Sequence, residues 1–594
     1  MTWEIAFVLF CISLMIGCLI LEMERPEIIV FITVVIFLAS GIISTGDAFK
    51  GFSNEGVLTI ALFFIIAGGI QKSDLTNIFI HKMLNSHKSA RKSLPKILIP
   101  ISAMSAFLNN TPIVVTFTPI IRNWCEKNNI SPSKFLIPLS YATILGGTIT
   151  IIGTSTNLVV HGLLLDNNLP GFSFFQLGIV GIPITLLGIL YITTIGFKLL
   201  PNHPVKNKDM MENSRKYFGE LKVTEQFLFI NQTIKDAKLR NLNGLYLIGI
   251  IRDQHMLTPV TSSTLIKAGD RLIFAGMIST IADLQNQKGL ELVTESGSIL
   301  EQIKNKKTKI VEAVVSQHSS LIHKKIRNTN FRGRYDAAVI AVHRKNERIE
   351  SKIGDITLKP GDILLMITGD DFPKRDYSHD FYIVNSNNEF DILPSITRFK
   401  SWITLIILVS LIFFVSVGFL SMLKGAAVAV ILLFFLKVIT PKEAKDYIDF
   451  NVLLLIASSF GIGSALINSG TAEWIANGLL SIVNPLNGGI FVLIIIYLAT
   501  NILTEIITNN AAAVMMFPIA MEVAVKTLVD PLALAVIVAI AASASFSTPI
   551  GYQTNMIVYS PGGYSFKDYL KVGIPLNLIV MTTTIIIVYF IWIL

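Results

Sequence analysis

Two apolar segments of the chain are interrupted at their centres by short polar runs. The first, Leu94–Ile121, contains Asn109–Pro112, and the second, Leu503–Glu522, contains Thr508–Asn510. Asn and Thr offer hydrogen-bond donors and acceptors without the cost of burying a charge. The N-terminus of a helix adds unpaired N–H groups that attract an anion, whereas unwound carbonyls and amide oxygens suit Na⁺. Each segment therefore carries the chemistry to bind a small anion and a cation.

A second polar break accompanies each of these segments. It is Gly153–Asn157 in the first half of the chain and Gly551–Asn555 in the second. Glycine lets backbones approach closely and leaves carbonyls exposed. Asn110 and Asn509 are 399 positions apart, and the last residues of the two glycine breaks are 398 apart. This matched spacing indicates one site built from two related halves.

A simpler interpretation is that these Asn, Ser and Thr residues only join helices by hydrogen bonds. That role does not require matched spacing in both halves, so the spacing favours a binding site. Glu505, beside the second polar run, is either a proton-coupling carboxylate or a group that holds the segment by pairing with a donor. We expect His161 at a helix interface rather than in a site.

Composition places these breaks in a membrane protein. Of 594 residues, 52% are hydrophobic and 15% are charged, which lies outside the range of soluble domains. A helix needs about 20 apolar residues to cross a bilayer. Besides the broken segment, the first half offers the spans Trp3–Leu21, Ile28–Ile43, Val57–Ile70, Phe135–Val160 and Phe174–Leu199.

The C-terminal half repeats this layout. Its spans are Trp402–Leu420, Gly425–Val438, Val452–Ile467, Gly489–Leu503 and Ala533–Thr548, followed by a final span, Val572–Leu594. Val57 and Val452, which begin matching spans, are 395 positions apart. We therefore expect a polytopic α-helical membrane protein. It would contain two repeats of five membrane helices plus one re-entrant hairpin each, at about 94–121 and 503–522.

Basic residues predict the orientation. Lys and Arg gather in the loop Lys72–Lys96, in the central polar block and in Lys437–Lys445, so these parts are expected in the cytoplasm. The loops Ser44–Glu55 and Leu164–Gly171 hold one Lys between them and are expected outside. Both termini are then extracytoplasmic, the two repeats are inverted, and the chain is a multi-pass protein of the inner (plasma) membrane.

The polar block between residues 201 and 398 is itself duplicated. Leu245–Arg252 recurs as Ala337–Arg344, and the turn at Gly269 recurs at Gly361, both 92 positions later. Short β-branched runs bounded by Gly-Asp turns predict strands. We expect two small cytosolic α+β domains, 201–305 and 306–398, inserted between membrane repeats at 1–200 and 399–594. The basic residues form no dense run, so no nucleic-acid partner is expected.

At the four polar breaks the chain resembles the divalent anion/sodium symporters, which include sodium-coupled dicarboxylate and sulfate carriers. That family marks its hairpin tips with Ser-Asn-Thr and its unwound segments with a Gly-Thr-Pro-Pro-Asn type motif, and this chain keeps the central Asn of each tip. The resemblance implies Na⁺-coupled symport by alternating access and a homodimer in the lipid bilayer. One Na⁺ would be held by Ser105, Asn109, Asn110 and the Gly153 carbonyl, and a second by Thr504, Asn509 and the Gly551 carbonyl. The anion would lie between Asn110, Thr111, Thr154, Asn509, Asn510 and Gln553.

Departures from the family pattern indicate which anion the protein binds. Pro112 follows the first tip, and Tyr552-Gln553 stands where the dicarboxylate carriers have Thr-Pro. A compact tetrahedral oxyanion needs only neutral donors, so we expect sulfate, with a di- or tricarboxylate as the alternative.

The two central units resemble the C-terminal regulatory domains of potassium-uptake proteins (TrkA-C type), an insertion that suits the sulfate permease branch of the family. They are expected either to sense a nucleotide or metabolite or to serve as a dimerisation platform. A ligand-gated channel is the alternative class, but neither half of the sequence contains a TVGYG-type filter. An enzyme is not expected, because the sequence offers no catalytic triad, metal cluster or phosphate loop.

Overall fold

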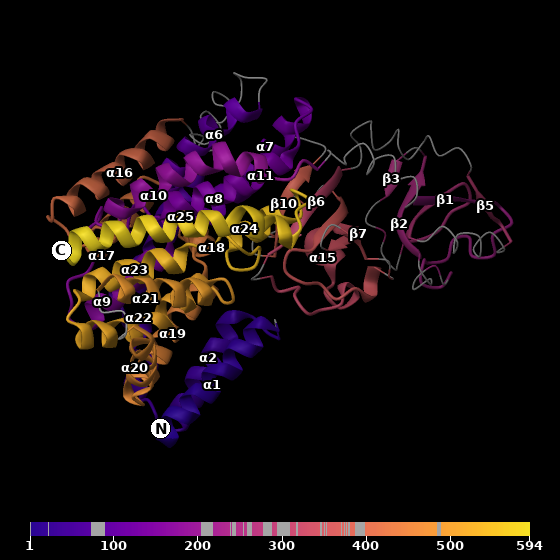
Figure 1. Ribbon diagram of the computed structural model, residues 1–594. Helices are drawn as coiled ribbons and strands as arrows, with labels where there is room; N and C mark the ends of the chain where they lie inside the picture. The colour runs from indigo at the N-terminus through magenta and orange to yellow at the C-terminus, as the bar shows by residue number, and fades with distance from the viewer. Residues whose placement is uncertain are drawn as a thin grey trace.

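Two bodies make up the computed structural model, a bundle of helices and two β-sheet units at one end of it (Figure 1). The structure describes residues 2–21, 23–72, 90–203, 218–237, 239, 245–253, 255–257, 260, 264–276, 288–293, 309–316, 319–344, 347–349, 351, 353–369, 371–372, 375, 377, 380–386, 398–483 and 489–594. Most of the predicted basic loop Lys72–Lys96 and the predicted domain boundary at 305/306 lie outside these residues.

The helices of the first half are α1 (Trp3–Ile20), α2 (Pro26–Ala39), α3 (Thr45–Phe49), α4 (Glu55–Gln71), α6 (Ala90–Ser105), α7 (Asn110–Lys127), α8 (Leu136–Gly147), α9 (Ser155–Asp166), α10 (Gly178–Tyr191) and α11 (Phe197–Leu199). In this half, the helices α6 to α9 begin or end at the polar breaks. Residues 106–109, which end in Asn109, separate α6 from α7, and residues 148–154 separate α8 from α9.

The second half follows the same order. Its helices are α16 (Arg398–Ser416), α17 (Met422–Phe435), α18 (Pro441–Tyr447), α19 (Phe450–Asn468), α20 (Thr471–Val483), α21 (Gly489–Thr504), α22 (Asn509–Thr527), α23 (Pro531–Ser543), α24 (Gln553–Tyr559) and α25 (Phe566–Trp592). Residues 505–508 separate α21 from α22, and residues 544–552 separate α23 from α24.

Local capping shows the correspondence between the halves. Ser44 precedes the short helix α3 and Thr440 precedes the short helix α18, and each forms a capping box that satisfies the first N–H groups of its helix. The long helix that follows is capped by the side chain of Asn54 in α4 and of Asp449 in α19. The same local signals therefore start the same elements in each half.

The helix pairs around the two tips are longer than predicted. The first pair, α6 and α7, spans 90–127 instead of 94–121. The second pair, α21 and α22, spans 489–527, so the predicted span Gly489–Leu503 coincides with α21, the helix that leads into the second tip. An apolar run alone does not distinguish half of a hairpin from a membrane span.

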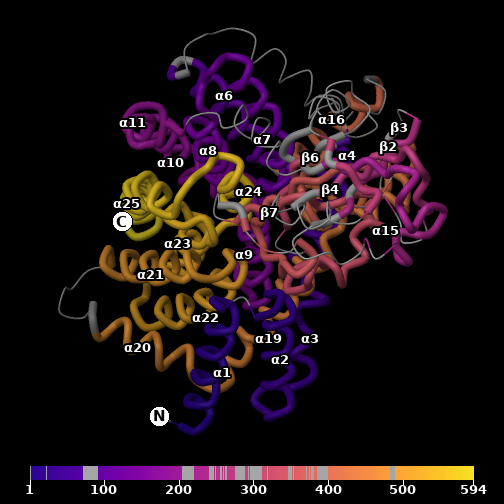
Figure 2. The backbone as a smooth tube through the Cα atoms, turned by 90° about the vertical axis from the view of Figure 1, so that its right-hand side faces the viewer, coloured from indigo at the N-terminus to yellow at the C-terminus, as the bar shows by residue number. Residues whose placement is uncertain are grey.

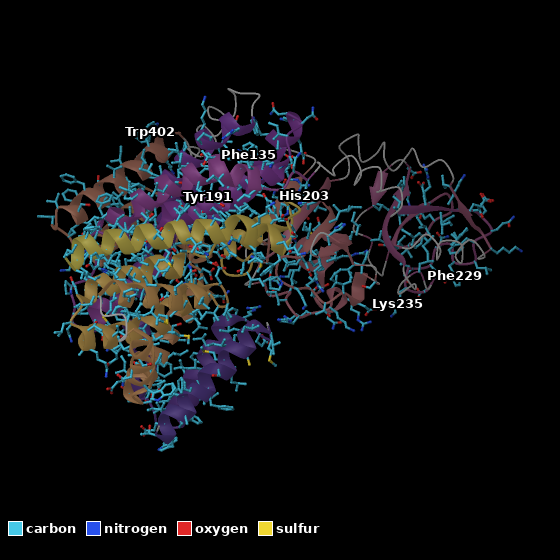
Figure 3. All side chains as sticks on the ribbon, viewed as in Figure 1. Phe135, Tyr191, His203, Phe229, Lys235 and Trp402 are labelled. Carbon is cyan, nitrogen blue, oxygen red and sulfur yellow. The ribbon has the colours of Figure 1, made fainter. Side chains whose placement is uncertain are left out.

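Seven of the described helical segments are long and apolar enough to cross a membrane: Trp3–Ile20, Thr45–Ile70, Gly178–Leu199, Phe399–Ser416, Phe450–Asn468, Gly489–Ile506 and Phe566–Trp592. Outer helices expose large apolar side chains, among them Phe413, Phe435 and Phe590, as a lipid-facing surface does. In Figure 3 Trp402 on α16 also lies at the outside of the bundle. In contrast, every residue from Ala533 to Ser543 is buried, so α23 lies in the interior. The protein is a multi-pass membrane protein.

Each sheet unit contains one five-stranded antiparallel sheet. The first sheet unit holds β1 (Phe218–Val223), β2 (Leu245–Arg252), β3 (His255–Leu257), β4 (Arg271–Gly276) and β5 (Leu290–Leu292). The second sheet unit holds β6 (Lys309–Val315), α15 (Phe331–Tyr335), β7 (Ala337–Arg344), β8 (Glu347–Arg348), β9 (Ile363–Thr368) and β10 (Phe381–Ser386). The strand orders, β3-β2-β4-β1-β5 and β8-β7-β9-β6-β10, are the same when strands are matched along the chain. The repeated runs Leu245–Arg252 and Ala337–Arg344 are strands, as predicted.

One ion pair recurs in both sheet units. Arg252 Nε lies 2.8 Å from Asp270 Oδ1, and Arg344 Nε lies 2.8 Å from Asp362 Oδ1. In each pair Nη2 contacts the other carboxylate oxygen, and both Asp side chains are buried. The two partners bridge the second strand of the unit and the turn before the fourth, which fixes the fold of the unit.

Removing one partner of the second pair should loosen its sheet. Arg344→Met leaves the Asp362 carboxylate buried without its guanidinium, which should cost about 3 kcal/mol of local stability. Hydrogen exchange of the β7 and β9 amides in the full chain should accelerate accordingly. Arg327→Met, which breaks an exposed pair with Asp355 in the same unit, should leave these amides nearly unchanged. Equal exchange rates in the two variants would contradict this role.

Candidate functional site

The two tips meet the two glycine breaks in a crossed arrangement. Asn110, at the first tip, donates from Nδ2 to the Tyr552 hydroxyl in the second-half break at 2.7 Å. Asn509, at the second tip, donates from Nδ2 to Thr156 Oγ1 beside the first-half break at 2.8 Å. Tyr552 also contacts Thr154 at 3.1 Å and is within hydrogen-bonding reach of Asn509. The structure therefore brings both tips and both breaks to one place.

Further bonds extend this network on either side. Asn510 Oδ1 accepts from Ser155 Oγ at 3.1 Å and from Thr156 Oγ1 at 3.2 Å. Thr111 Oγ1 donates to Gln553 Oε1 at 2.9 Å. All six predicted anion-site residues, Asn110, Thr111, Thr154, Asn509, Asn510 and Gln553, thus belong to one group of contacts. Each is uncharged, and Asn110, Thr154 and Asn510 are buried.

Tyr552 and Tyr382 complete this group, although neither was predicted as a site residue. Gln553 Nε2 donates to Tyr382 Oη at 3.1 Å, and Tyr382 lies in β10 of the second sheet unit, 171 positions earlier in the chain. Tyr552 was noted only as a departure from a family pattern. The motif spacing does not reveal Tyr382, because its contact depends on how the sheet unit sits against the bundle.

The first predicted cation set is a cluster of oxygen atoms. Ser105 Oγ lies 2.5 Å from Asn110 Oδ1 and 2.8 Å from the Thr143 carbonyl. A Cβ added to Gly147 would lie 2.9 Å from Asn110 Oδ1 and 3.3 Å from the Gly153 carbonyl oxygen. Glycine thus keeps open a small space between two oxygens, and such oxygen donors suit a hard cation. Asn109 caps α7 without a side-chain hydrogen bond to the helix.

The second predicted set differs from the first. A Cβ on Gly551 would lie 2.9 Å from the Thr504 carbonyl oxygen and would collide with Ser545 Oγ. Ser545 stands 398 positions after Gly147, so a hydroxyl replaces the open space of the first set. Asn509 directs its Nδ2 to Thr156. The oxygens gathered at Gly551 therefore include Ser545 Oγ, which the sequence analysis did not predict.

Two asparagines hold the unwound backbone of the breaks. Asn157 Nδ2 donates to the carbonyls of Gly147 and Thr150 at 3.1 and 2.9 Å. Asn555 Nδ2 donates to the carbonyls of Ser545 and Thr548 at 2.9 and 3.1 Å. Each side chain thus satisfies two carbonyls that have left a helix. This shared task gives a physical reason for the 398-residue spacing found in the sequence.

Glu505 ties the second tip to the second break. Its Oε1 accepts from the Ser547 amide at 2.8 Å and from Asn577 Nδ2 at 3.1 Å, and its Oε2 accepts from Ser545 Oγ at 3.1 Å. Three donors converge on this carboxylate, which favours the holding role over a proton-carrying one. His161 packs against Gly171, as expected for a residue at an interface.

Comparison with known proteins bears on the class of the protein. The sequence pattern of a citrate transporter family matches residues 16–540. A Chlamydomonas reinhardtii protein named as a sulfur deprivation response regulator is 34% identical over 95% of this chain and 98% of its own length. Sodium/sulfate cotransporter 2 of the same alga is 24% identical over 91% of this chain and 84% of its own length. A sodium-dependent dicarboxylate transporter of Staphylococcus saprophyticus is 33% identical over 26% of this chain and 29% of its own length.

Neutralising Glu505 should weaken the tip. In Glu505→Gln an NH₂ group faces a donor in place of a carboxylate oxygen, so we expect the protein to lose about 2 kcal/mol of stability. The thermal unfolding midpoint of the purified chain measures this, with Glu473→Gln, in an exposed pair with Lys526, as the control. Combining Glu505→Gln with Asn577→Leu should cost less than the sum of the single changes. An unchanged midpoint in Glu505→Gln would refute the holding role.

Proposed function

Since the chain belongs to the citrate transporter family, we propose that it is a secondary transporter that couples Na⁺ to the uptake of a small divalent anion, sulfate, by alternating access. The observation that carries this proposal is the convergence of both tips on Tyr552 and the neighbouring break. Shared sites of this kind, at the junction of two repeats, are typical of secondary transporters. The family and the names of the relatives indicate a transporter rather than an enzyme.

The chemistry of the network favours sulfate over a carboxylate. Its hydroxyl and amide groups come from both tips and both breaks, and those of Asn110, Thr154 and Asn509 contact the Tyr552 hydroxyl. These neutral donors suit a compact oxyanion, whereas a bidentate Arg would suit a carboxylate group. The large Tyr552 ring occupies a position where the family's dicarboxylate carriers have Thr, so it leaves less room for an extended di- or tricarboxylate.

Sodium would supply the positive charge that these neutral donors lack. We assign one ion to Ser105, Asn109, Asn110 and the Gly153 carbonyl, on the oxygen cluster around Gly147. We assign a second ion to Thr504, Asn509 and the Gly551 carbonyl, with Ser545 added from the structure. Cations beside the anion make its entry into a region of low dielectric less costly.

We propose that the halves are inverted repeats and that the sheet units lie in the cytoplasm. Lys72 pairs with Glu443 at 2.6 Å and Lys400 Nζ donates to the Lys437 carbonyl, so basic segments of both halves gather at one end. In Figure 1 both chain termini lie away from the sheet units. Basic loops are cytoplasmic in membrane proteins, which places the termini outside the inner membrane.

The remaining organisation follows from the resemblance. We propose membrane repeats at 1–200 and 399–594 and TrkA-C-like regulatory domains at 201–305 and 306–398. Their shared strand order supports a duplicated unit. We also propose that the protein forms a homodimer and that the sheet units bind a nucleotide or a metabolite.

Sulfate uptake tests the assignment directly. Proteoliposomes that contain the chain should accumulate labelled sulfate only with an inward Na⁺ gradient, because the ions and the anion share one site. Asn110→Ala and Asn509→Ala should abolish uptake, whereas Thr118→Val should not, since the hydrogen bond that Thr118 makes to the described residues stays within its own helix, to the Val114 carbonyl. Uptake that needs a proton gradient alone, or that survives both Asn substitutions, would refute the proposal. Large single-channel openings would indicate a channel.

Tyr552 should set the choice between sulfate and longer anions. Tyr552→Thr removes the ring and one donor, so the ratio of sulfate to succinate uptake should fall by about tenfold, a change typical of a reshaped pocket. Initial rates for both tracers in the same vesicles give this ratio. If wild-type vesicles take up succinate and not sulfate, the dicarboxylate alternative holds instead.

A further inference from the structure

The second sheet unit reaches into the candidate site. Tyr382 lies in β10, an edge strand of its sheet, and its hydroxyl contacts Gln553 of α24 at 3.1 Å and Ser316 of the same unit at 3.2 Å. Burial raises the pKa of Tyr382 to about 12, so the phenol keeps its proton at neutral pH. Figures 1 and 2 show this unit at the ends of α7 and α24. Through Gln553, two hydrogen bonds connect Tyr382 to Thr111.

Polar contacts hold the unit in this position from several sides. Arg122 of α7 pairs with Glu312 of β6 at 2.7 Å, and both side chains are nearly buried. Ser560, which follows α24, donates to the Gly361 carbonyl at 3.3 Å. Near the turn between α1 and α2, Arg25 donates to the Ser319 carbonyl at 3.4 Å. The unit thus contacts a tip helix, a break helix and the N-terminal helix pair at the same time.

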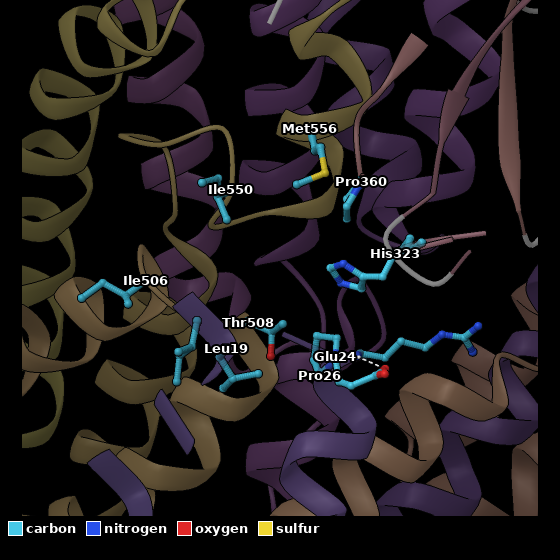
Figure 4. Close-up of a pocket in the computed structure, with 12 residues that line it drawn as sticks. Leu19, Glu24, Pro26, His323, Pro360, Ile506, Thr508, Ile550 and Met556 are labelled. Atoms are coloured by element: carbon cyan, nitrogen blue, oxygen red, sulfur yellow. Dashed lines mark hydrogen bonds between the residues drawn. The ribbon is translucent and has the colours of Figure 1, made fainter. Parts of the chain in front are cut away.

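A pocket lies between this unit and the second tip. His323 and Pro360 of the sheet unit, Thr508 and Ile506 of the tip, and Ile550 and Met556 beside the second break lie around one space, which Leu19 and Pro26 also line (Figure 4). The sheet unit therefore forms one wall of a space that extends to the tip. In Figure 3 His203 lies where the bundle meets the sheets, and its Nε2 is 3.8 Å from Asp568 Oδ2.

We propose that the second sheet unit is a gate on the cytoplasmic side of the site. When the unit is seated, Tyr382 fixes the Gln553 amide and the unit closes the route between the tips and the cytoplasm; when it lifts, the route opens. The proposal rests on the transport function proposed above and adds a control element to it. The described contacts include an ion pair and several hydrogen bonds, as in the polar interfaces between domains that move relative to one another.

This arrangement also explains how a cytosolic ligand can act on transport. A ligand shifts an equilibrium only if it binds one of the two states more tightly. A molecule that binds the sheet units better when they are released would favour the open route, and one that binds the seated form better would favour closure. Tyr382 makes the connection direct, because it touches a residue of the site without an intermediate element.

Accessibility of one cysteine tests the gate without any transported anion. In a chain whose three native cysteines are replaced by Ala, Met556→Cys places a thiol under Gly361 of the sheet unit. Its rate of reaction with a bulky water-soluble maleimide should rise about tenfold in Glu312→Gln and in Tyr382→Ala. Each variant loses a hydrogen bond that holds the unit in its seat, and the free energy of one such bond changes the ratio of seated to released unit by about this factor. Arg327→Gln, in an exposed pair within the same unit, serves as the matched control and should leave the rate unchanged.

Tethering the unit tests the gate from the opposite direction. Arg122→Cys and Glu312→Cys, bridged by a short reducible bis-thiosulfonate, should hold the unit in its seat and stop tracer uptake, and a reducing agent should restore uptake to the unbridged level. Uptake by the bridged protein at the unbridged rate, or a labelling rate that neither Glu312→Gln nor Tyr382→Ala changes, would overturn the gate. If labelling responds as expected but wild-type vesicles take up no sulfate, the gate holds and the substrate assignment fails. Tyr382→Phe, which loses only the hydroxyl, checks that the effect of Tyr382→Ala does not come from misfolding.

Discussion

The whole site depends on keeping unwound backbone satisfied inside an apolar body. Carbonyls that leave a helix at membrane depth have no water to bond, so every break requires a local partner. Asn157 and Asn555 meet this demand with the same pair of bonds, each to a carbonyl seven and ten positions earlier. Free glycine carbonyls can face an ion only because these side chains hold the rest of the break in place.

The second constraint is that neither half can form the site alone. The first tip bonds to Tyr552 of the second half, and the second tip bonds to Thr156 of the first. A movement of one half against the other would therefore change all the hydrogen bonds that join a tip of one half to a break of the other. This is the property that alternating access needs, because the site must exist in two arrangements that differ as a whole. Glu505 has the opposite task, since it fixes the second tip to the break of its own half.

Sequence predicted the elements that repeat and missed those that appear once. Asn110, Asn509, Asn157 and Asn555 were found because duplication places each at a matched distance, and the strands β2 and β7 because they recur after 92 residues. Ser545 was missed because its counterpart in the first half is Gly147, which has no side chain, so the matched spacing of polar residues does not point to it. Tyr382 was missed because only packing of separate units brings it to Gln553.

The position of the sheet units in the chain gives their contacts a mechanical consequence. They are inserted between the two halves, so any relative movement of the halves acts on both of their chain connections. The second unit also contacts α7, which carries the first tip, and α24, which begins in the second break. If these two helices move apart in the proposed transport cycle, a body attached to both must follow one of them and release the other. Because Arg122–Glu312 lies on one part and Tyr382–Gln553 on the other, these two contacts cannot both survive a large relative displacement of α7 and α24. In the proposed transport cycle, seating of the sheet unit and movement of the halves would therefore be coupled by geometry.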